Sequence, residues 1–232
     1  MPLNIGRRPQ PTPEQPVEIP QVTETPVTQT VETSRPKISL SKGQKVSLSK
    51  NITQGKAFVG LGWNLNRYDT GGDFDLDASV FLLGENGKVN NESDVIFYNN
   101  TVGRNECVKH SGDNRTGEGE GFDEVIEIDF SKIPADISRI AISVTIFDAE
   151  NRRQNFGQIE NSFIRVAKME NDKPVFDDDT ISFELGEDFS IETAIVVAEI
   201  YRYKGDWKFS AIGAGYQGGL KNIMANYGID AE

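Results

Sequence analysis

The first 57 residues of this chain contain no aromatic residue, and eight of its ten prolines fall within residues 1–36. Such a segment cannot bury enough apolar surface to offset the conformational entropy that it would lose on folding. We therefore expect residues 1–36 to form a disordered, proline-rich tail, partly in the polyproline II conformation. Residues 37–232 are numerous enough to form a single folded domain with a substantial core.

Charge divides the chain in the same way. Residues 1–50 hold seven Lys or Arg against four Asp or Glu, and the rest hold 17 against 32, so the net charge of −12 is the sum of +3 and −15. An acidic domain repels phosphate backbones, which argues against nucleic-acid binding by the folded part. It attracts cations, although an acidic surface that only maintains solubility explains the same composition.

The cysteine count and the hydropathy favour a cytoplasmic protein. Cys107 is the only cysteine, so the chain forms no intrachain disulfide. No apolar run approaches the ~18 residues that span a bilayer, so we expect no direct membrane insertion. The basic N-terminus is not followed by an apolar stretch and does not resemble a secretory signal.

The rest of the chain is a succession of short, β-branched or alternating runs separated by turn residues. This pattern predicts an all-β fold, a two-sheet antiparallel β-sandwich, rather than alternating βα units. Asn86-Gly87 predicts a hairpin turn and Gly205-Asp206 another. Helical signal is limited to one turn at residues 149–154 and a short helix at residues 220–227. The predicted strands are residues 38–43, 46–51, 56–63, 76–83, 95–98, 125–130, 140–147, 163–169, 181–185, 194–203 and 207–212.

A first acidic stretch lies in Asp73-Phe74-Asp75-Leu76-Asp77. In an extended chain the three aspartates project to one side, and Phe74 and Leu76 project to the other. Carboxylates in one row repel one another unless a cation lies among them. The stretch is therefore a candidate half-site for a hard cation, and the alternative is a solvated strand end.

A second acidic stretch, residues 110–124, is rich in glycine. Ca²⁺ takes six to eight oxygen ligands from carboxylates and carbonyls at about 2.3–2.6 Å, and a flexible acidic loop supplies both kinds. The order of acids does not fit an EF-hand, and a solvated loop is the alternative. From the two stretches together, the predicted metal ligands are Asp73, Asp75, Asp77, Asp113, Asn114, Glu118, Asp123 and Glu124.

The donor set favours calcium as the metal, with one or two ions bound. With one histidine and one cysteine in the chain, zinc and copper sites are poorly supported. Magnesium prefers fewer protein ligands and more water. Asp148 and Glu150 either line the same acidic end or cap the turn before Asn151.

Seven short motifs resemble those of the TerD family, in order from about residue 37 to residue 230. The most specific is the string from Gly112 to Gly119. The others are Gly60-Leu61-Gly62-Trp63, residues 73–79, Ile96-Phe97-Tyr98-Asn99-Asn100, Ile133-Pro134-Ala135-Asp136, Gln154-Asn155-Phe156-Gly157 and Glu199-Ile200-Tyr201-Arg202.

The resemblance implies a calcium-binding β-sandwich with a role in bacterial resistance to tellurite and other stresses. It also implies a non-enzymatic scaffold or sensor at the inner face of the membrane, in a complex with other TerD-family proteins and a membrane-embedded partner. Two positions depart from the family pattern, because Asn64 stands where an aspartate is common and Phe122 interrupts the acidic loop. Both reduce negative charge near the predicted metal.

Two other functions stay open. Some relatives have been described as cyclic-nucleotide-binding proteins, but the glycines here alternate with acids instead of forming a basic phosphate cradle. A metal-dependent hydrolase would need a nucleophile or base, and Cys107 and His110 lack an evident third group. We expect both to be structural residues, and Trp63 and Trp207 to be core residues.

Overall fold

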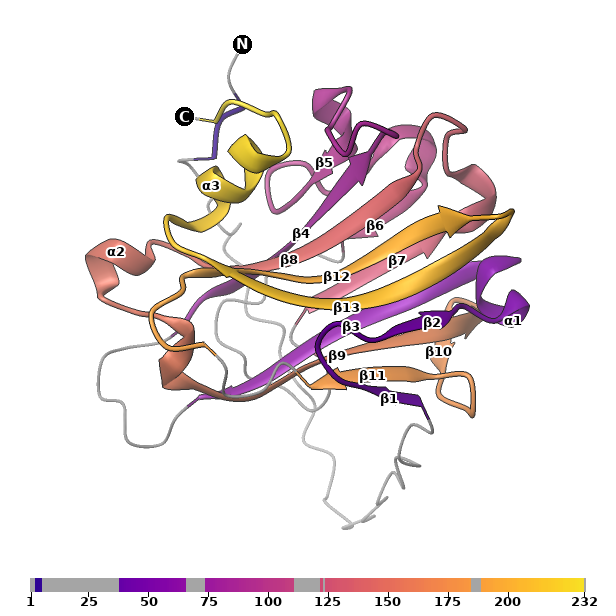
Figure 1. The fold of residues 1–232 in the computed structure, drawn as a ribbon, viewed down its shortest axis with the longest axis horizontal. Helices are drawn as coiled ribbons and strands as arrows, with labels where there is room; N and C mark the ends of the chain where they lie inside the picture. Colours follow the sequence, from indigo (N-terminus) through magenta and orange to yellow (C-terminus); the bar gives the residue numbers. More distant parts are fainter. Residues whose placement is uncertain are drawn as a thin grey trace, which may run out of the picture.

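The structure, a computed structural model, describes residues 3–5, 38–65, 74–110, 122, 124–184 and 189–231. Most of the expected tail lies outside these ranges. The described residues form two β-sheets packed face to face, with short helices at their margins (Figure 1). This architecture confirms the predicted β-sandwich.

One sheet has seven strands. Its order is β1 (Ile38–Leu40), β11 (Ile181–Glu184), β9 (Ile159–Glu170), β3 (Lys56–Leu65), β7 (Glu124–Asp129) and β6 (Val108–His110), and β10 (Lys173–Val175) pairs with β9. The other sheet has six strands. Its order is β2 (Lys45–Ser47), β13 (Asp206–Tyr216), β12 (Ala194–Tyr203), β8 (Arg139–Ile146), β4 (Leu76–Leu83) and β5 (Val95–Ile96).

Alternation of side chains explains how each sheet contributes to the core. In β7, Glu124, Ile126 and Ile128 are buried, whereas the residues between them are half-buried, as a period of two requires. The main core lies between the sheets and includes Trp63 and Trp207, which confirms both tryptophans as core residues. All eight residues of β4 are buried, because its outer face is covered as well.

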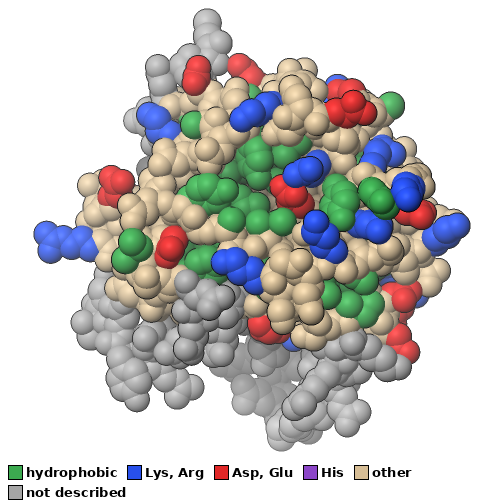
Figure 2. Space-filling model, in the orientation of Figure 1, with side chains coloured by type: hydrophobic (Ala, Val, Ile, Leu, Met, Phe, Trp, Pro, Cys, Tyr) green, Lys and Arg blue, Asp and Glu red, His purple; other side chains and the backbone are tan. Residues whose placement is uncertain are grey.

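The end of the chain covers part of the outer face of the six-stranded sheet. Helix α3 (Gly219–Asn226) contributes Leu220, Ile223 and Met224 to a second apolar cluster, which includes Phe81 and Leu83 of β4. In Figure 2, apolar side chains gather near the middle of the visible face and are surrounded by charged side chains of both signs.

The other helical elements are single turns. They are α1 (Lys50–Thr53), α2 (Ala149–Arg152) and the 3₁₀ turns η1 (Glu92–Asp94), η2 (Arg104–Glu106), η3 (Phe130–Lys132) and η4 (Phe156–Gln158). The helices α2 and α3 confirm the two helical predictions. Within the described ranges, none of the helices is long and apolar enough to cross a membrane.

Three details differ from the sequence-based expectation. Strands β1 and β2 join different sheets, and β1 pairs with β11 in parallel, so the sandwich is not purely antiparallel. The chain does turn at Asn86-Gly87, but β4 pairs with β5 only after η1, so no tight hairpin forms there. Leu3, at the start of the expected tail, forms a bridge with Ala231, and the two ends of the chain lie side by side (Figure 1).

Candidate metal centre

The first acidic stretch leads into β4, and its described aspartates are buried. Asp75 is 6% exposed and Asp77 is 3% exposed. Phe74 and Leu76 belong to the core between the sheets, whereas Asp77 lines a cavity on the other side of the strand. The predicted alternation is therefore confirmed for these three residues. The backbone is fixed by the Phe147 amide, which donates to the Asp75 carbonyl at 2.8 Å.

The cavity beside Asp77 has a volume of about 420 Å³ and an acidic lining. Asp77 of β4 faces it together with Asp148 and Glu150, which lie where β8 runs into α2, and Lys221 is the one basic residue among its lining. Thr145, Asn151 and Thr193 add neutral oxygen atoms. The donors are all oxygen, which suits a hard cation such as Ca²⁺.

Asp148 lines the cavity, which is one of the two roles that the sequence left open. It stands at the N-cap position of α2 with a left-handed backbone, φ of 53°, but its side chain makes no capping hydrogen bond to the helix backbone. Its carboxylate instead accepts a hydrogen bond from Nδ2 of Asn151 at 2.6 Å. Thr145 is the register partner of Asp77 on β8. Its place in the cavity lining can be predicted only when the pairing of these two strands is known.

The second acidic stretch is flanked by a buried pair. His110 is the last residue of β6 and Glu124 is the first residue of β7, and their Nε2 and Oε2 atoms lie 3.0 Å apart. The same Nε2 lies 3.1 Å from the carbonyl oxygen of Ala78 in β4. Because a carbonyl oxygen only accepts, Nε2 carries the proton. The ring of His110 therefore donates to Ala78 and lies against the Glu124 carboxylate, so that it links β6 and β7 of one sheet to β4 of the other.

This link shows that both acidic stretches attach at the same end of the sandwich. Ala78 lies five residues after Asp73, and His110 and Glu124 bracket residues 111–123. Other predicted ligands, namely Asp73, Asp113, Asn114, Glu118 and Asp123, lie outside the described residues. Among the described residues alone, no group of three or more acidic, histidine or cysteine side chains is close enough to hold a metal.

Phe122 has a structural role that the sequence did not reveal. Its ring makes an edge contact with Phe58 at 4.9 Å and stacks on Phe176 at 5.7 Å, over the outer face of the seven-stranded sheet. A Cβ atom on Gly60 of β3 would overlap the Phe122 ring. The Phe122 ring therefore packs in the space that the missing side chain of Gly60 leaves. Phe122 lies two residues before Glu124 in the sequence.

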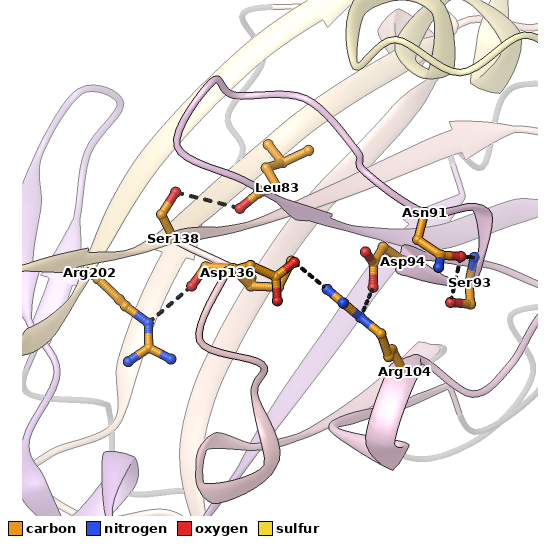
Figure 3. Close-up of polar contacts among 9 residues, drawn as sticks. Leu83, Asn91, Ser93, Asp94, Arg104, Asp136, Ser138 and Arg202 are labelled. Carbon is orange, nitrogen blue, oxygen red and sulfur yellow. Dashed lines mark hydrogen bonds and ion pairs between the residues drawn. The ribbon is translucent and has the colours of Figure 1, made fainter.

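The opposite end of β4 carries a buried carboxylate of another kind. Asp94 is fully buried, and its Oδ1 accepts from Nε of Arg104 at 3.0 Å (Figure 3). Nη2 of Arg104 donates to Asp136 at 2.8 Å. Burial raises the pKa of Asp94, and the Arg104 charge opposes that rise. Here the protein itself provides the cation.

Cys107 is buried near this second carboxylate. Burial, together with the negative charge of Asp94, raises the pKa of its thiol to about 11. At neutral pH the thiol stays protonated, whereas the thiolate is the nucleophile. Cys107 is therefore a core residue, in keeping with the sequence-based prediction.

The comparisons with known proteins decide the family. Residues 37–227 match the model of the TerD domain. The chain belongs to the TerD family. It is 54% identical over 193 residues to general stress protein 16U of Bacillus subtilis, covering 83% of this chain and 97% of that protein. It is 50% identical over 195 residues to the tellurium resistance protein TerD of Serratia marcescens, covering 84% and 98%.

Solved structures agree on the fold. A crystal structure of a TerD homologue from Streptomyces coelicolor aligns with a TM-score of 0.54 and 20% identity, over 73% of this chain and 95% of that one. A protein described as of unknown function, SAV2460, aligns with a TM-score of 0.56 and 19% identity. The names of the Bacillus and Serratia relatives place this family among proteins of stress response and tellurium resistance.

Proposed function

We propose that this TerD-family chain is a calcium-binding, non-enzymatic module of a bacterial stress-response system of the tellurite-resistance type. It binds one or two Ca²⁺ ions through the residues that the sequence identified, and it acts as a scaffold or sensor. The observation that supports this most is the contact among Ala78, His110 and Glu124, which brings the flanks of both acidic stretches to one end of the sandwich.

The charges at that end explain what the ion contributes. Asp75, Asp77 and Glu124 are each at least nine-tenths buried, and a buried carboxylate is costly unless a cation or several hydrogen-bond donors stabilise it. A divalent ion among these groups and the ligands of residues 111–123 would lower their mutual repulsion. Ion binding would therefore stabilise the folded domain by linkage.

The non-enzymatic part of the proposal is supported by the same geometry. The carboxylate of Glu124 is buried against His110, and the thiol of Cys107 is protonated and buried. Neither group is presented as an activated nucleophile.

Calorimetric titration of the full chain with CaCl₂ tests the metal site. We expect saturable binding of one or two ions, and we expect it to be lost in the Asp75→Asn/Asp113→Asn variant. The matched control is Asp172→Asn/Asp206→Asn, which makes the same chemical change at two exposed positions. Heat that is the same for both variants, or no saturable heat in the wild type, would contradict the proposal.

The complex with other TerD-family proteins and a membrane-embedded partner rests on the family resemblance. Affinity purification of the full chain from detergent-solubilised membranes, with and without a chelator, tests it. We expect an integral membrane protein to copurify in the presence of calcium. Recovery of the chain without such a protein under either condition would contradict this part.

A further inference from the structure

The N-terminal residues Leu3, Asn4 and Ile5 lie on the folded domain. The Leu3 amide donates to the Asp230 carbonyl at 2.9 Å, and Leu3 forms a parallel β-bridge with Ala231. Nδ2 of Asn99 donates to the Asn4 carbonyl at 3.2 Å, and the Tyr98 hydroxyl donates to the Ile5 carbonyl. These three backbone hydrogen bonds are all made with residues more than 90 positions away.

The side chains of the segment fit an apolar groove. Leu3 and Ile5, which are two residues apart and so share one side of an extended chain, pack against the second apolar cluster. That cluster includes Phe97, Tyr98 and the buried residues of α3. Asn4, between them, is exposed. The pattern is that of an extended peptide docked by its backbone and by alternate side chains.

We propose that this groove is a peptide-docking surface whose occupant is the N-terminal segment Leu3–Ile5 of the same molecule, so that the intervening chain is anchored at both ends. The groove lies beside the acidic cavity, because Ile5 and Tyr98 also line that cavity. Docking therefore completes one wall of the cavity.

The intervening chain favours docking within one molecule. Residues 6–37, 32 residues in all, connect the segment covalently to the domain. A covalent connection replaces the bulk concentration of the segment with an effective concentration, which for linked binding modules reaches the millimolar range. At micromolar protein concentration, the tethered segment outcompetes the same segment from another molecule.

The segment adds to the domain found in the relatives. The TerD domain match begins at residue 37. The alignments cover almost the full length of the Bacillus and Serratia relatives, but they leave about a sixth of this chain unaligned. The docking motif therefore lies outside the shared domain, although the groove that it occupies is formed by residues within or directly beside that domain.

A paired set of full-length variants tests the docking. Leu3→Asp/Ile5→Asp places two charges in the apolar groove, and the matched control Val17→Asp/Ile19→Asp makes the same charge change in the intervening chain. Nuclear magnetic resonance spectra report the Asn99 side-chain amide and the backbone amides of residues 229–231. We expect these signals to shift in the first variant and to stay in place in the control. Equal spectra for the two variants would overturn the proposal.

A peptide competition adds an independent measurement. A labelled peptide with the sequence Met1–Arg8 is titrated into wild-type chain and into Leu3→Asp/Ile5→Asp. Because the tethered segment competes only in the wild type, we expect the apparent Kd there to be at least about tenfold higher. Equal affinity for the two proteins, or no binding to the variant at millimolar peptide, would overturn the proposal.

A mixed sample separates docking within one chain from docking between chains. A nitroxide is attached at the Asn4→Cys thiol, since Cys107 is buried and protonated. We expect the label to broaden the Asn99 signal of its own chain. Broadening of Asn99 in unlabelled, ¹⁵N-enriched wild-type chains mixed with spin-labelled ones at micromolar concentration would show that a second copy is the occupant, and would overturn the intramolecular arrangement.

Discussion

The two ends of β4 hold buried carboxylates in opposite ways. At the end that begins with Leu76, Asp77 shares an acidic cavity with Asp148 and Glu150. At the end near Leu83, about 20 Å away along the strand, Asp94 is paired with Arg104, which also binds Asp136. At the Leu83 end an arginine compensates the buried charge. At the Leu76 end three carboxylates line one cavity.

The difference concerns how each buried charge is compensated. A buried charge must be paired or well hydrogen-bonded, because its desolvation costs several kcal/mol. The Arg104 pair supplies a counter-charge from within the chain, bonded to Oδ1 of Asp94, whereas Oδ2 is buried without a hydrogen bond. The cavity end collects oxygen donors from β4, β8 and α2 without a paired arginine. The described carboxylates alone do not form a metal site, so the Ca²⁺ that we propose at this end would also need the ligands predicted in residues 111–123.

The largest effect is expected from Arg104→Ala, which breaks the internally neutralised end. Removing Arg104 leaves the Asp94 carboxylate buried without its cation, so we expect the free energy of unfolding to fall by about 3–5 kcal/mol at pH 8. The folded-state pKa of Asp94 is already raised by burial and rises further without Arg104. Folded chains then bind the proton more readily than unfolded ones, so stability falls as pH rises and the loss is smaller at pH 5.

Urea unfolding at both pH values measures this effect. The control is Asp136→Asn, which keeps the Arg104–Asp94 pair and removes only a half-exposed partner, so it should lower the free energy of unfolding far less than Arg104→Ala. An equal fall in the free energy of unfolding for Arg104→Ala and Asp136→Asn would contradict the prediction, because the buried pair with Asp94 would then matter no more than the exposed pair with Asp136.

An intermediate effect is expected from Asp77→Asn at the cavity end. Calcium at a hundredfold excess over Kd should stabilise the wild type by about 2.7 kcal/mol, and the variant should lose most of this gain. In chelator the variant should be at least as stable as the wild type, because one negative charge is removed from the cavity.

Thermal or urea unfolding with calcium and with chelator provides the measurement. Asp172→Asn is the control, because its exposed side chain lies outside the cavity and its left-handed backbone suits asparagine. An undiminished calcium effect in Asp77→Asn would remove this residue from the ion site.

A smaller effect is expected from Gly60→Ala, which disturbs the ring that packs beside the second acidic stretch. The added Cβ would overlap Phe122 and lie 2.6 Å from Cε1 of Phe58, at a cost of about 1–3 kcal/mol. Calcium affinity should fall as well if Phe122 positions Glu124. The control is Gly55→Ala, where no heavy atom lies within 4 Å. Equal stability of the two variants would show that the Phe122 ring moves aside freely.

Much of the fold could be predicted because alternation in a strand follows directly from sequence. The sequence predicted β4 as residues 76–83, which is its observed range. It also predicted that Ile126 and Ile128 share one face of β7, and both are buried. The short strands β6 and β10 were missed, because three residues carry too little periodicity. The repeated pattern of β1 and β2 gave no sign that they join different sheets, since that depends on partners more than 130 residues away.

The candidate site was predictable in part for the same reason. Asp75 and Asp77 stand out as acids within an apolar strand, and Glu124 stands out at the start of another. The sequence also offered Asp148 and Glu150 as lining of the acidic end, where the cavity includes both. The link from His110 to Ala78 and the packing of Phe122 over Gly60 join segments far apart in the chain. No local pattern reports such contacts.

The sequence by itself determined the class of fold, the family and the chemical character of the acidic stretches, because these follow from local alternation, motif order and residue type. The tertiary structure decided which carboxylates share a space and which are paired with arginine. It also decided that Leu3 and Ile5 lie on the domain. The physical reason is that pairing and desolvation depend on distances between residues that only folding brings together.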